Sequence, residues 1–319
     1  MCRQAQRLNA AADYKCGYVA LVGRPNAGKS TLLNAWVGQK VAIVSPKPQT
    51  TRSNQLGVLT TDKWQAVFVD APGLLRAKHA LDRVLVASAQ QALVEADVVL
   101  WVADVSRMPA AEDERLAELV RSRIGSRSLL LVLNKADHLR AHRVLPNTDA
   151  YRALAPEAEW MLVSALRGDN LERVLARIVE LLPVGPQLFP EEQVTDKHLR
   201  VLAGELVREA ALYSLHEEVP HGLAVVVEEY DETDPALVRI EAMVYVDNDR
   251  HKGIVIGQGG SMLKVIGSRA RKEIEALVER QVFLGLRVKV RDGWRTDERE
   301  VARMGYGDAR ELRSGDGDF

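Results

Sequence analysis

Residues 18–30 read YVALVGRPNAGKS, a short apolar run followed by the pattern G-x-x-x-x-G-K-S at residues 23–30. Glycines let the backbone wrap closely around phosphate oxygens, while the loop N–H groups and the start of the following helix supply positive potential. In this pattern Lys29 reaches the β- and γ-phosphates and Ser30 ligates magnesium. The residues expected to contact the nucleotide in this loop are Asn26, Ala27, Gly28, Lys29, Ser30 and Thr31. The stretch predicts a strand, a phosphate loop and a helix, in that order.

The composition is that of a globular protein with more than one domain. The 319 residues exceed a typical single domain, and 47% apolar with 27% charged residues is an ordinary balance. No run approaches the length of a membrane span, and the N-terminal segment lacks the long apolar stretch of a secretory signal. Cys2 and Cys16 have no metal-ligand spacing and indicate free thiols in a reducing cytosol.

Short apolar runs alternate with longer amphipathic segments over the first 180 or so residues. Such an alternation predicts an α/β domain, with a mostly parallel sheet covered by helices on both faces. The expected strands are 18–22, 66–69, 98–103, 129–133 and 160–163. In sheets of this kind ligands bind at the carboxyl ends of the strands, and each motif described below follows a strand end.

Asp70-Ala-Pro-Gly73 ends the second expected strand. An aspartate at a buried strand end can hold magnesium through a water, and the Gly73 N–H can sense the γ-phosphate. D-x-P-G is also common turn chemistry. Its position downstream of the phosphate loop favours the nucleotide-binding interpretation.

Asn134-Lys135-Ala136-Asp137 ends the fourth expected strand and predicts a preference for guanine. A carboxylate at Asp137 can accept hydrogen bonds from guanine N1–H and the 2-amino group, which adenine lacks. Asn134 is expected to brace the loop, and the stem of Lys135 to cover the base. Ser164-Ala165-Leu166 follows the next strand, where the Ala165 N–H is expected to meet the guanine oxygen.

The segment PKPQTTR at residues 46–52 lies where a mobile switch belongs, between the first helix and the second expected strand. A threonine there can complete the magnesium shell only when the γ-phosphate is present, and we favour Thr51 over Thr50. The expected metal ligands are thus Ser30, Thr51 and Asp70, and the residues expected to act in hydrolysis are Lys29, Thr51 and Gly73.

Leu74 and Leu75 follow Gly73, where some fast GTPases place a glutamine that orients water. Neither leucine can orient water, so we expect slow intrinsic hydrolysis, with the water held by backbone groups, a cation or a partner. Asn26 could help to hold a potassium ion beside the phosphates, or it could only brace the loop. Both roles stay open.

Three prolines in Leu182–Lys197 indicate a linker to a second domain. Beyond it the pattern predicts helix, strand, strand, helix, helix and strand, an α+β domain. The expected ranges are about 198–216, 223–230, 237–246, 254–266, 269–280 and 282–290. The chain end after about Met304 has the composition of a disordered tail.

Gly257-Gln258-Gly259-Gly260 places a G-x-x-G loop in this domain. Residues 250–295 hold 11 Lys and Arg against 4 Asp and Glu, a local net charge of +7, although the whole chain carries −1. A glycine loop of this kind lets an RNA backbone approach, with the bases lying along an apolar groove. With the element order, these features predict a type II KH domain. The candidate RNA contacts are Lys252, Gly257, Gln258, Gly259, Gly260, Lys264, Arg269, Arg271 and Lys272.

Together these segments resemble the Era family of bacterial GTPases over nearly the whole chain, from about Gly17 to Tyr306. GRPNAGKS, KPQTTR, DAPG, NKAD and SAL resemble its GTPase half; FPEEQVTD, EEVPHG and GIVIGQGGSMLKVIGSRAR resemble its KH half. The resemblance implies GTP/GDP and Mg²⁺ as ligands, slow hydrolysis, and binding near the 3′ end of 16S ribosomal RNA during small-subunit maturation. It also implies a cytoplasmic, monomeric protein, with peripheral association at the inner face of the cell membrane in some members. Gln258 and Gly259 depart from the family, where a lysine is usual in one of these positions.

The expected organisation is an N-terminal extension (1–16), a GTPase domain (17–182), a linker (183–199), a KH domain (200–304) and a disordered tail (305–319). The same motifs leave three other functions to consider. A GTPase acting on transfer RNA or on another ribosomal subunit should lack the KH segment, and an ATP-dependent kinase would not carry NKAD. A pure RNA-binding assembly factor with a weakly active GTPase half stays the alternative.

Overall fold

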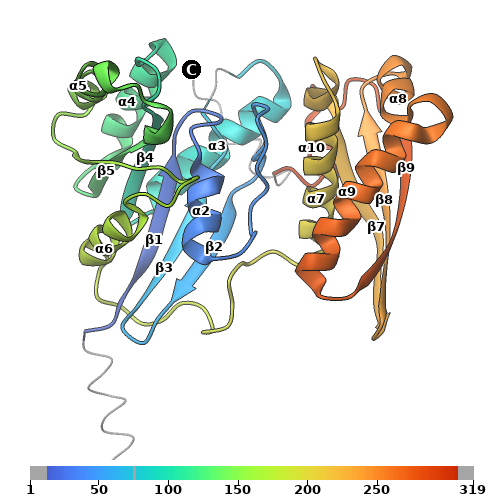
Figure 1. The fold of residues 1–319 in the computed structure, drawn as a ribbon, viewed down its shortest axis with the longest axis horizontal. Coiled ribbons are helices and arrows are strands. Elements are labelled where there is room, and N and C mark those ends of the chain that lie inside the picture. Colours follow the sequence, from blue (N-terminus) through green and yellow to red (C-terminus); the bar gives the residue numbers. More distant parts are fainter. Residues whose placement is uncertain (1–12, 75–76, 308–319) are drawn as a thin grey trace, which may run out of the picture. The chain divides into compact units, whose positions relative to one another are not determined.

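The computed structural model describes residues 13–74 and 77–307 (Figure 1). The chain divides into two compact units. The first holds most of the chain up to Asp196. The second holds the chain from Lys197 onward, together with two segments from earlier in the sequence, Ile43–Thr50 and residues 77–84.

A six-stranded sheet forms the centre of the first unit, in the order β2-β3-β1-β4-β5-β6. Its strands are β1 (Lys15–Val22), β2 (Gln55–Thr60), β3 (Trp64–Asp70), β4 (Val98–Asp104), β5 (Ser128–Asn134) and β6 (Glu159–Leu162). All neighbouring strands are parallel except β2, which pairs antiparallel with β3. The structure therefore confirms the predicted α/β class and mostly parallel sheet.

Helices cover both faces of this sheet, because successive strand residues point to opposite sides. Val19 and Leu21 of β1 join one apolar cluster, whereas Ala20 and Val22 join another. The first cluster contains side chains of α2 (Lys29–Val37) and α6 (Leu171–Leu181). The second contains side chains of α3 (Ala80–Glu95), α4 (Ala111–Ile124) and α5 (Val144–Leu154). The first cluster includes a stacked pair, Trp36 and Phe68, with ring centroids 5.0 Å apart.

Two features of this unit differ from the sequence prediction. The edge strand β2 was not predicted, since QLGVLT is short and contains Gly57. A Cβ at Gly57 would lie 2.4 Å from Leu33 Cδ1, so the glycine allows α2 to pack closely against β2. The first strand also begins at Lys15, earlier than the predicted Tyr18 and within the predicted extension, of which residues 1–12 lie outside the described part of the chain.

The predicted linker packs along the first unit instead of running free. Val194 O accepts a hydrogen bond from Val58 N at 2.9 Å. The Gln65 side chain accepts from Leu188 N and Phe189 N at 2.9 and 3.0 Å, and it donates to Phe189 O at 2.8 Å. The linker backbone therefore finds its partners on β2 and β3.

The second unit has the predicted order α-β-β-α-α-β. Its elements are α7 (Leu199–Ser214), β7 (Ala224–Asp234), β8 (Leu237–Val246), α8 (Asp249–Ile256), α9 (Ser261–Val278) and β9 (Gln281–Val290). The sheet order is β7-β8-β9, with β7 antiparallel and β9 parallel to β8. This arrangement is the predicted type II KH fold.

The two middle helices were predicted with wrong boundaries. Instead of 254–266 and 269–280, α8 ends at Ile256 and α9 begins at Ser261. Gly257, Gly259 and Gly260 have φ values of 73°, 58° and 80°, which break the helix. Gly267 does not end a helix but lies inside α9, where it allows close packing: a Cβ there would be 3.4 Å from Leu286 Cδ1.

The end of the predicted KH domain packs against Tyr306, the second residue of the predicted tail. Buried Trp294 donates a hydrogen bond to Gly222 O at 3.0 Å and stacks on Tyr306 at 6.1 Å between ring centroids. A short helix, α10 (Glu298–Arg303), lies between these aromatic residues in sequence. The rest of the predicted tail, residues 308–319, lies outside the described residues. Among the described helices, none has the length and apolar character needed to cross a membrane.

Candidate functional site

The sheet register brings the predicted nucleotide motifs to one edge. Leu21 pairs with Asp70 across β1 and β3, and Asp104 pairs with Asn134 across β4 and β5. The loop that follows β1 and the segments that follow β3, β4 and β5 therefore leave the sheet on the same side. This is the edge where parallel α/β sheets bind ligands.

The phosphate loop has a shape that only glycine permits at two positions. Gly28 has φ 99°, and a Cβ there would lie 2.1 Å from Asn134 Nδ2. A Cβ at Gly23 would lie 2.3 Å from the backbone oxygen of Val102. Asn26 also adopts a positive φ, 62°, which asparagine tolerates better than most residues. The loop is therefore shaped by the Val102 backbone and the Asn134 side chain that pack against it.

Lys29 is buried beneath this loop, at 5% exposure. Its Nζ donates to the backbone oxygens of Gly23 and Arg24 at 3.3 and 3.1 Å. Burial lowers the pKa of Lys29, and the nearby Asp70 carboxylate acts in the opposite direction. An ammonium group that is stripped of water and close to the loop is well placed to receive phosphate oxygens.

The three predicted metal ligands meet at one point. Ser30 Oγ donates to Asp70 Oδ2 at 2.5 Å and lies 3.1 Å from Thr51 Oγ1, which in turn lies 3.3 Å from Asp70 Oδ2. Asp70 is fully buried, and its Oδ1 has no hydrogen-bond partner among the described residues. Burial raises the pKa of Asp70, although Lys29 lowers it. An oxygen cluster with an unpaired buried carboxylate atom fits a hard cation such as magnesium.

Thr50 does not join this cluster. Its Oγ1 lies 2.7 Å from Ser45 Oγ and donates to Lys47 O at 2.7 Å. The two adjacent threonines therefore have different partners. The geometry supports the preference for Thr51 as the metal ligand.

The DAPG segment lies against the phosphate loop. A Cβ at Gly73 would be 2.5 Å from Pro25 N, so this position needs glycine for the two loops to approach. Leu74 packs against an apolar cluster of the first unit. A leucine with this contact offers no polar group to an attacking water; Leu75 lies outside the described residues.

Asn134 connects two of the nucleotide loops, as predicted for a bracing residue. Its Nδ2 donates to Ala27 O at 2.8 Å, and its Oδ1 accepts from Ala165 N at 3.0 Å. The structure thus gives the Ala165 N–H a partner other than the guanine oxygen expected from the sequence. Leu166 is 77% exposed at the rim of this loop.

Neighbouring side chains orient the Asp137 carboxylate. Ser164 Oγ donates to Asp137 Oδ1 at 2.7 Å, and His138 Nε2 lies 3.4 Å from Oδ2. Burial acts to raise the pKa of Asp137, but the Ser164 hydrogen bond and nearby charges bring it below its ordinary value. The side chain is therefore an ionised acceptor, as guanine recognition requires.

Asp104, at the end of β4, is a residue that the motif analysis did not identify. Lys135 has φ 65°, and its Nζ is 2.8 Å from Asp104 Oδ2. This ion pair fixes the lysine stem beside the loop and lowers the pKa of Asp104 despite partial burial. Its place directly after the expected strand 98–103 was the signal available in the sequence.

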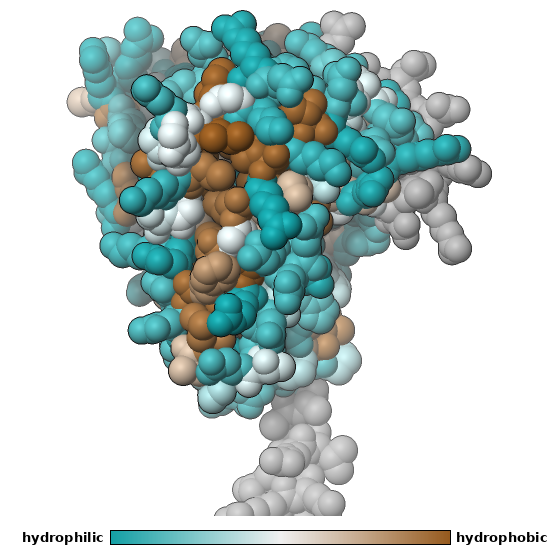
Figure 2. Space-filling model, turned by 90° about the vertical axis from the view of Figure 1, so that its right-hand side faces the viewer, coloured by the Kyte–Doolittle hydropathy of each residue, from teal (hydrophilic) through white to brown (hydrophobic). Residues whose placement is uncertain are grey.

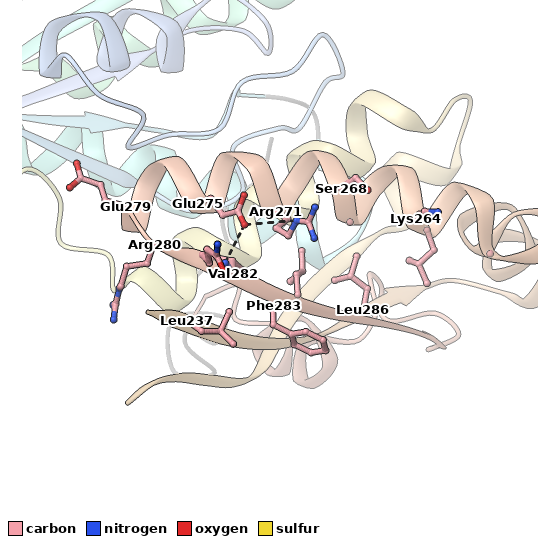
Figure 3. Close-up of a pocket in the computed structure, with 15 residues that line it drawn as sticks. Leu237, Lys264, Ser268, Arg271, Glu275, Glu279, Arg280, Val282, Phe283 and Leu286 are labelled. Carbon is pink, nitrogen blue, oxygen red and sulfur yellow. Dashed lines mark hydrogen bonds and ion pairs between the residues drawn. The ribbon is translucent and has the colours of Figure 1, made fainter. Parts of the chain in front are cut away.

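A groove of about 1170 Å³ lies between α9 and β9 in the second unit (Figure 3). Small-molecule pockets usually measure about 300–1,000 Å³, so this space suits an extended ligand. Lys264 and Arg271 extend from α9, opposite the strand side chains Phe283 and Leu286. Phe283 was not predicted from the sequence, because a single aromatic residue in a strand normally belongs to the core.

Some of the candidate RNA contacts line the groove, and the others do not. Gly260, Lys264 and Arg271 line it, whereas Arg269 lies over the Tyr213 ring of α7, with Cζ 4.1 Å from the ring centroid. Arg269 therefore packs against another helix. Lys252, Gly257, Gln258, Gly259 and Lys272 are not among the lining residues.

Apolar side chains gather in an elongated band between polar ones on the face drawn in Figure 2. The large apolar residues exposed in the second unit include Ile254, Val265 and Phe283, at 41%, 55% and 48% exposure. Of these three residues, Phe283 lines the groove, where an exposed aromatic ring can stack on a nucleobase.

Comparisons with known proteins identify both halves of the chain. Residues 18–135 match a family model described as a 50S ribosome-binding GTPase, and residues 218–295 match that of a KH domain. The chain is 39% identical over 294 residues to the GTPase Era of Ruminiclostridium cellulolyticum, covering 92% of this chain and 98% of that protein. It is 44% identical over 296 residues to the GTPase Era of Pseudomonas putida, covering 92% and 97%.

Two solved structures are similar over the same range. A variant of Aquifex aeolicus Era bound to GDP and AlF4⁻ matches with a TM-score of 0.86 at 41% identity, covering 92% of this chain and all of that one. Era in complex with MgGDPNP and nucleotides 1506–1542 of 16S ribosomal RNA matches with a TM-score of 0.87, at the same identity and coverage.

Proposed function

Because the chain belongs to the Era family of GTPases, we propose that it is a GTP-driven switch that binds 16S ribosomal RNA near its 3′ end and assists assembly of the small ribosomal subunit. The observation that supports the switch is the convergence of the Ser30 and Thr51 hydroxyls on Oδ2 of Asp70, a buried carboxylate whose Oδ1 has no hydrogen-bond partner among the described residues. Ser30 and Asp70 come from fixed elements, whereas Thr51 comes from the segment predicted to move.

In the proposed mechanism Lys29 and the phosphate-loop N–H groups hold the phosphates, and Ser30, Thr51 and Asp70 hold magnesium. The cation, when bound, offsets negative charge on the phosphate oxygens as the bond to the leaving group breaks. Gly73 keeps the DAPG backbone close to the phosphate loop, where its N–H can sense the γ-phosphate. Thr51 then links metal ligation to the presence of GTP.

Guanine recognition is assigned to Asp137, with its orientation fixed by Ser164 and its loop braced by Asn134. Lys135 and the Ser164–Leu166 loop cover the base. The Ala165 N–H now donates to Asn134 Oδ1. It can donate to the guanine oxygen only if it shares or gives up that hydrogen bond.

Hydrolysis is expected to be slow, because Leu74 supplies no group that positions water. Asn26 can contribute by holding potassium beside the phosphates or only by bracing the loop. Rates measured in potassium and in sodium separate these roles: equal rates leave the bracing role alone.

The RNA site is assigned to the groove between α9 and β9 and to the glycine loop at its end. One structural relative was solved in complex with nucleotides 1506–1542 of 16S ribosomal RNA, and this supports the same RNA target here. Lys264 and Arg271 are the cations that line this groove and are proposed to contact phosphates. Peripheral association with the inner face of the membrane and a monomeric state stay predictions; flotation with vesicles and analytical ultracentrifugation test them.

Leu74 also favours the alternative, an RNA-binding assembly factor whose GTPase half is weakly active. The test is GTP hydrolysis by purified protein with and without an RNA that spans the 3′ end of 16S ribosomal RNA. We expect RNA binding that depends on the bound nucleotide and phosphate release that RNA accelerates. RNA binding with no phosphate release in either condition would establish the alternative.

A further inference from the structure

The chain from the end of β4 to the first turn of α4, residues 104–113, contacts two nucleotide loops through an acidic side chain at each end. Asp104 Oδ2 lies 2.8 Å from Nζ of Lys135, in the loop assigned to guanine. Asp113 Oδ2 accepts a hydrogen bond at 2.8 Å from Nη1 of Arg24, in the phosphate loop. All of these residues belong to the first unit. One short segment therefore contacts the loops assigned to the two ends of the nucleotide.

The contact at the phosphate loop starts from a buried carboxylate. The side chain of Asp113 is 3% exposed, and its Oδ2 also accepts from Ala110 N at 2.9 Å, which caps the start of α4. Glu112 Oε2 lies 3.6 Å from Arg24 Nη2 and adds a second negative charge. The backbone oxygen of Arg24 accepts from Lys29 Nζ at 3.1 Å. The side chain of Arg24 thus fixes a residue whose backbone helps to position the phosphate-binding lysine.

The helix α5 holds the chain close to the guanine end of the segment. Tyr151 Oη donates to Asp104 O at 3.3 Å, and Asn147 Nδ2 donates to Val105 O at 2.8 Å. Both of these α5 side chains are buried. Burial raises the pKa of the Tyr151 phenol, and the negative charges of Asp113 and Asp104 act in the same direction, so the phenol stays protonated as a donor. The segment is therefore held by buried hydrogen bonds as well as by its two ion pairs.

The two ion pairs are better suited to positioning than to stability. The side chains of Arg24 and Lys135 are 35% and 29% exposed, and ion pairs that solvent reaches contribute little to the free energy of folding. Charge-assisted hydrogen bonds are nevertheless directional. Loops that already have the correct separation lose less conformational freedom when a ligand binds, which strengthens binding.

We propose that residues 104–113 form a spacer that fixes the separation between the phosphate loop and the guanine loop, with Arg24, Asp104 and Asp113 as positioning residues. This rests on the proposed nucleotide site and adds residues to which its motifs give no role. Guanine and the β-phosphate are common to GTP and GDP, so the spacer acts on both nucleotides alike. Thr51 differs in this respect, because its contact depends on the γ-phosphate.

The test compares full-length Arg24→Met, Asp104→Asn and the double variant by their affinities for magnesium-bound GDP and for a magnesium-bound, non-hydrolysable GTP analogue. Each single change removes one charge-assisted contact and should weaken binding of both nucleotides about fivefold. Release of either end already frees the separation of the loops, so release of the second end should add little. The double variant should therefore lose about tenfold, and not the product of about 25-fold that independent sites would give.

Three further variants control for other effects. Arg24→Lys keeps a cation for Asp113 and should recover most of the lost affinity. Arg115→Met is the matched control, because Arg115 is exposed on the same helix α4 and neither affinity should change. Asp113→Asn provides a second measurement should Arg24→Met fold poorly, since it keeps an acceptor for the Ala110 N–H but removes the charge that holds Arg24. It should weaken both nucleotides about threefold.

The outcomes separate the spacer from the proposed function. Losses that multiply in the double variant would overturn the spacer, because its two ends would then act independently. A loss confined to the GTP analogue would also overturn it, and so would affinities equal to those of the unmodified protein. Failure of the unmodified protein to bind either nucleotide would instead refute the proposed switch, and the spacer with it.

Discussion

The nucleotide site and the KH groove hold their functional residues in different ways. At the nucleotide site, buried polar groups position one another: Ser30 bonds to Asp70, and Asn134 bridges two loops. In the groove, Arg271 is 56% exposed, and its ion pair with Glu275 is long, at 3.9 Å. A site built from mutual hydrogen bonds is preorganised, so one substitution should disturb several contacts. A groove lined by separate cations should lose affinity in small, nearly independent steps.

The largest expected effect is at Asp70. Asp70→Asn keeps the shape but removes the charge that would hold magnesium, so GTP hydrolysis should fall by roughly a thousandfold. Without nucleotide, the same change should alter thermal stability little, because the cost of burying the carboxylate and its attraction to buried Lys29 are lost together. Single-turnover hydrolysis and a melting curve measure the two effects. A large loss of apo stability would show that Asp70 has a structural rather than a metal-binding role.

Asp137→Asn should change base preference. An amide replaces one acceptor oxygen by a donor, which opposes the 2-amino group of guanine but suits the 2-oxo group of xanthine. Because the change disturbs two charge-assisted hydrogen bonds from guanine to the Asp137 carboxylate, GTP affinity should fall by roughly 100-fold. XTP affinity should rise. Competition binding with the two nucleotides measures the change. Loss of both affinities together would indicate a collapsed loop and not a changed specificity.

In the groove, Arg271→Ala should weaken RNA binding by about three- to tenfold and reduce the salt dependence by about one counterion. Arg269→Ala is the matched control on the same helix, because Arg269 stacks on Tyr213 instead of lining the groove. Titration of a labelled RNA at several salt concentrations measures both. Equal losses for the two variants would contradict this assignment of the groove.

The smallest expected effect is at Glu275, whose carboxylate lies beside Arg271 and accepts from Val282 N at 3.2 Å. Glu275→Gln keeps an acceptor for that N–H but removes a negative charge from the groove. RNA affinity should rise by about twofold at low salt, and the gain should vanish at high salt, where exposed charges are screened. A loss of affinity would mean that the carboxylate itself contacts RNA.

The difference between the nucleotide site and the KH groove also explains which functional residues could be predicted from the sequence. Gly28, Lys29, Ser30, Asp70 and Asn134 were predicted from phosphate, metal and base chemistry, and the structure brings their loops to one edge of the sheet. The partner of the Ala165 N–H and the ion pair of Asp104 with Lys135 depend on the register of neighbouring strands, which no local pattern reports.

Prediction was weaker for the KH groove. Lys264, Arg269 and Arg271 lie within eight residues of one another and look alike in sequence. Which side of α9 each occupies depends on where the helix begins, and the predicted boundary was wrong. The edge strand β2 was missed for a similar reason, since Gly57 weakens its pattern while making its packing against α2 possible.

The assignment of Ile43–Thr50 to the second unit has a consequence for modularity. A GTPase fragment cut at the linker would keep every nucleotide-binding motif, yet it would lose the helix that holds this segment and would expose Ile43, which belongs to the apolar core of the KH fold. Grafting a different RNA-binding module onto the fragment would also remove Arg208 and Glu209 of α7, whose side chains hydrogen-bond to the Thr50 carbonyl oxygen and the Val44 N–H of this segment. The two halves are therefore not interchangeable parts, and changes to α7 and to the loop before Thr51 should be accepted in evolution only as matched pairs.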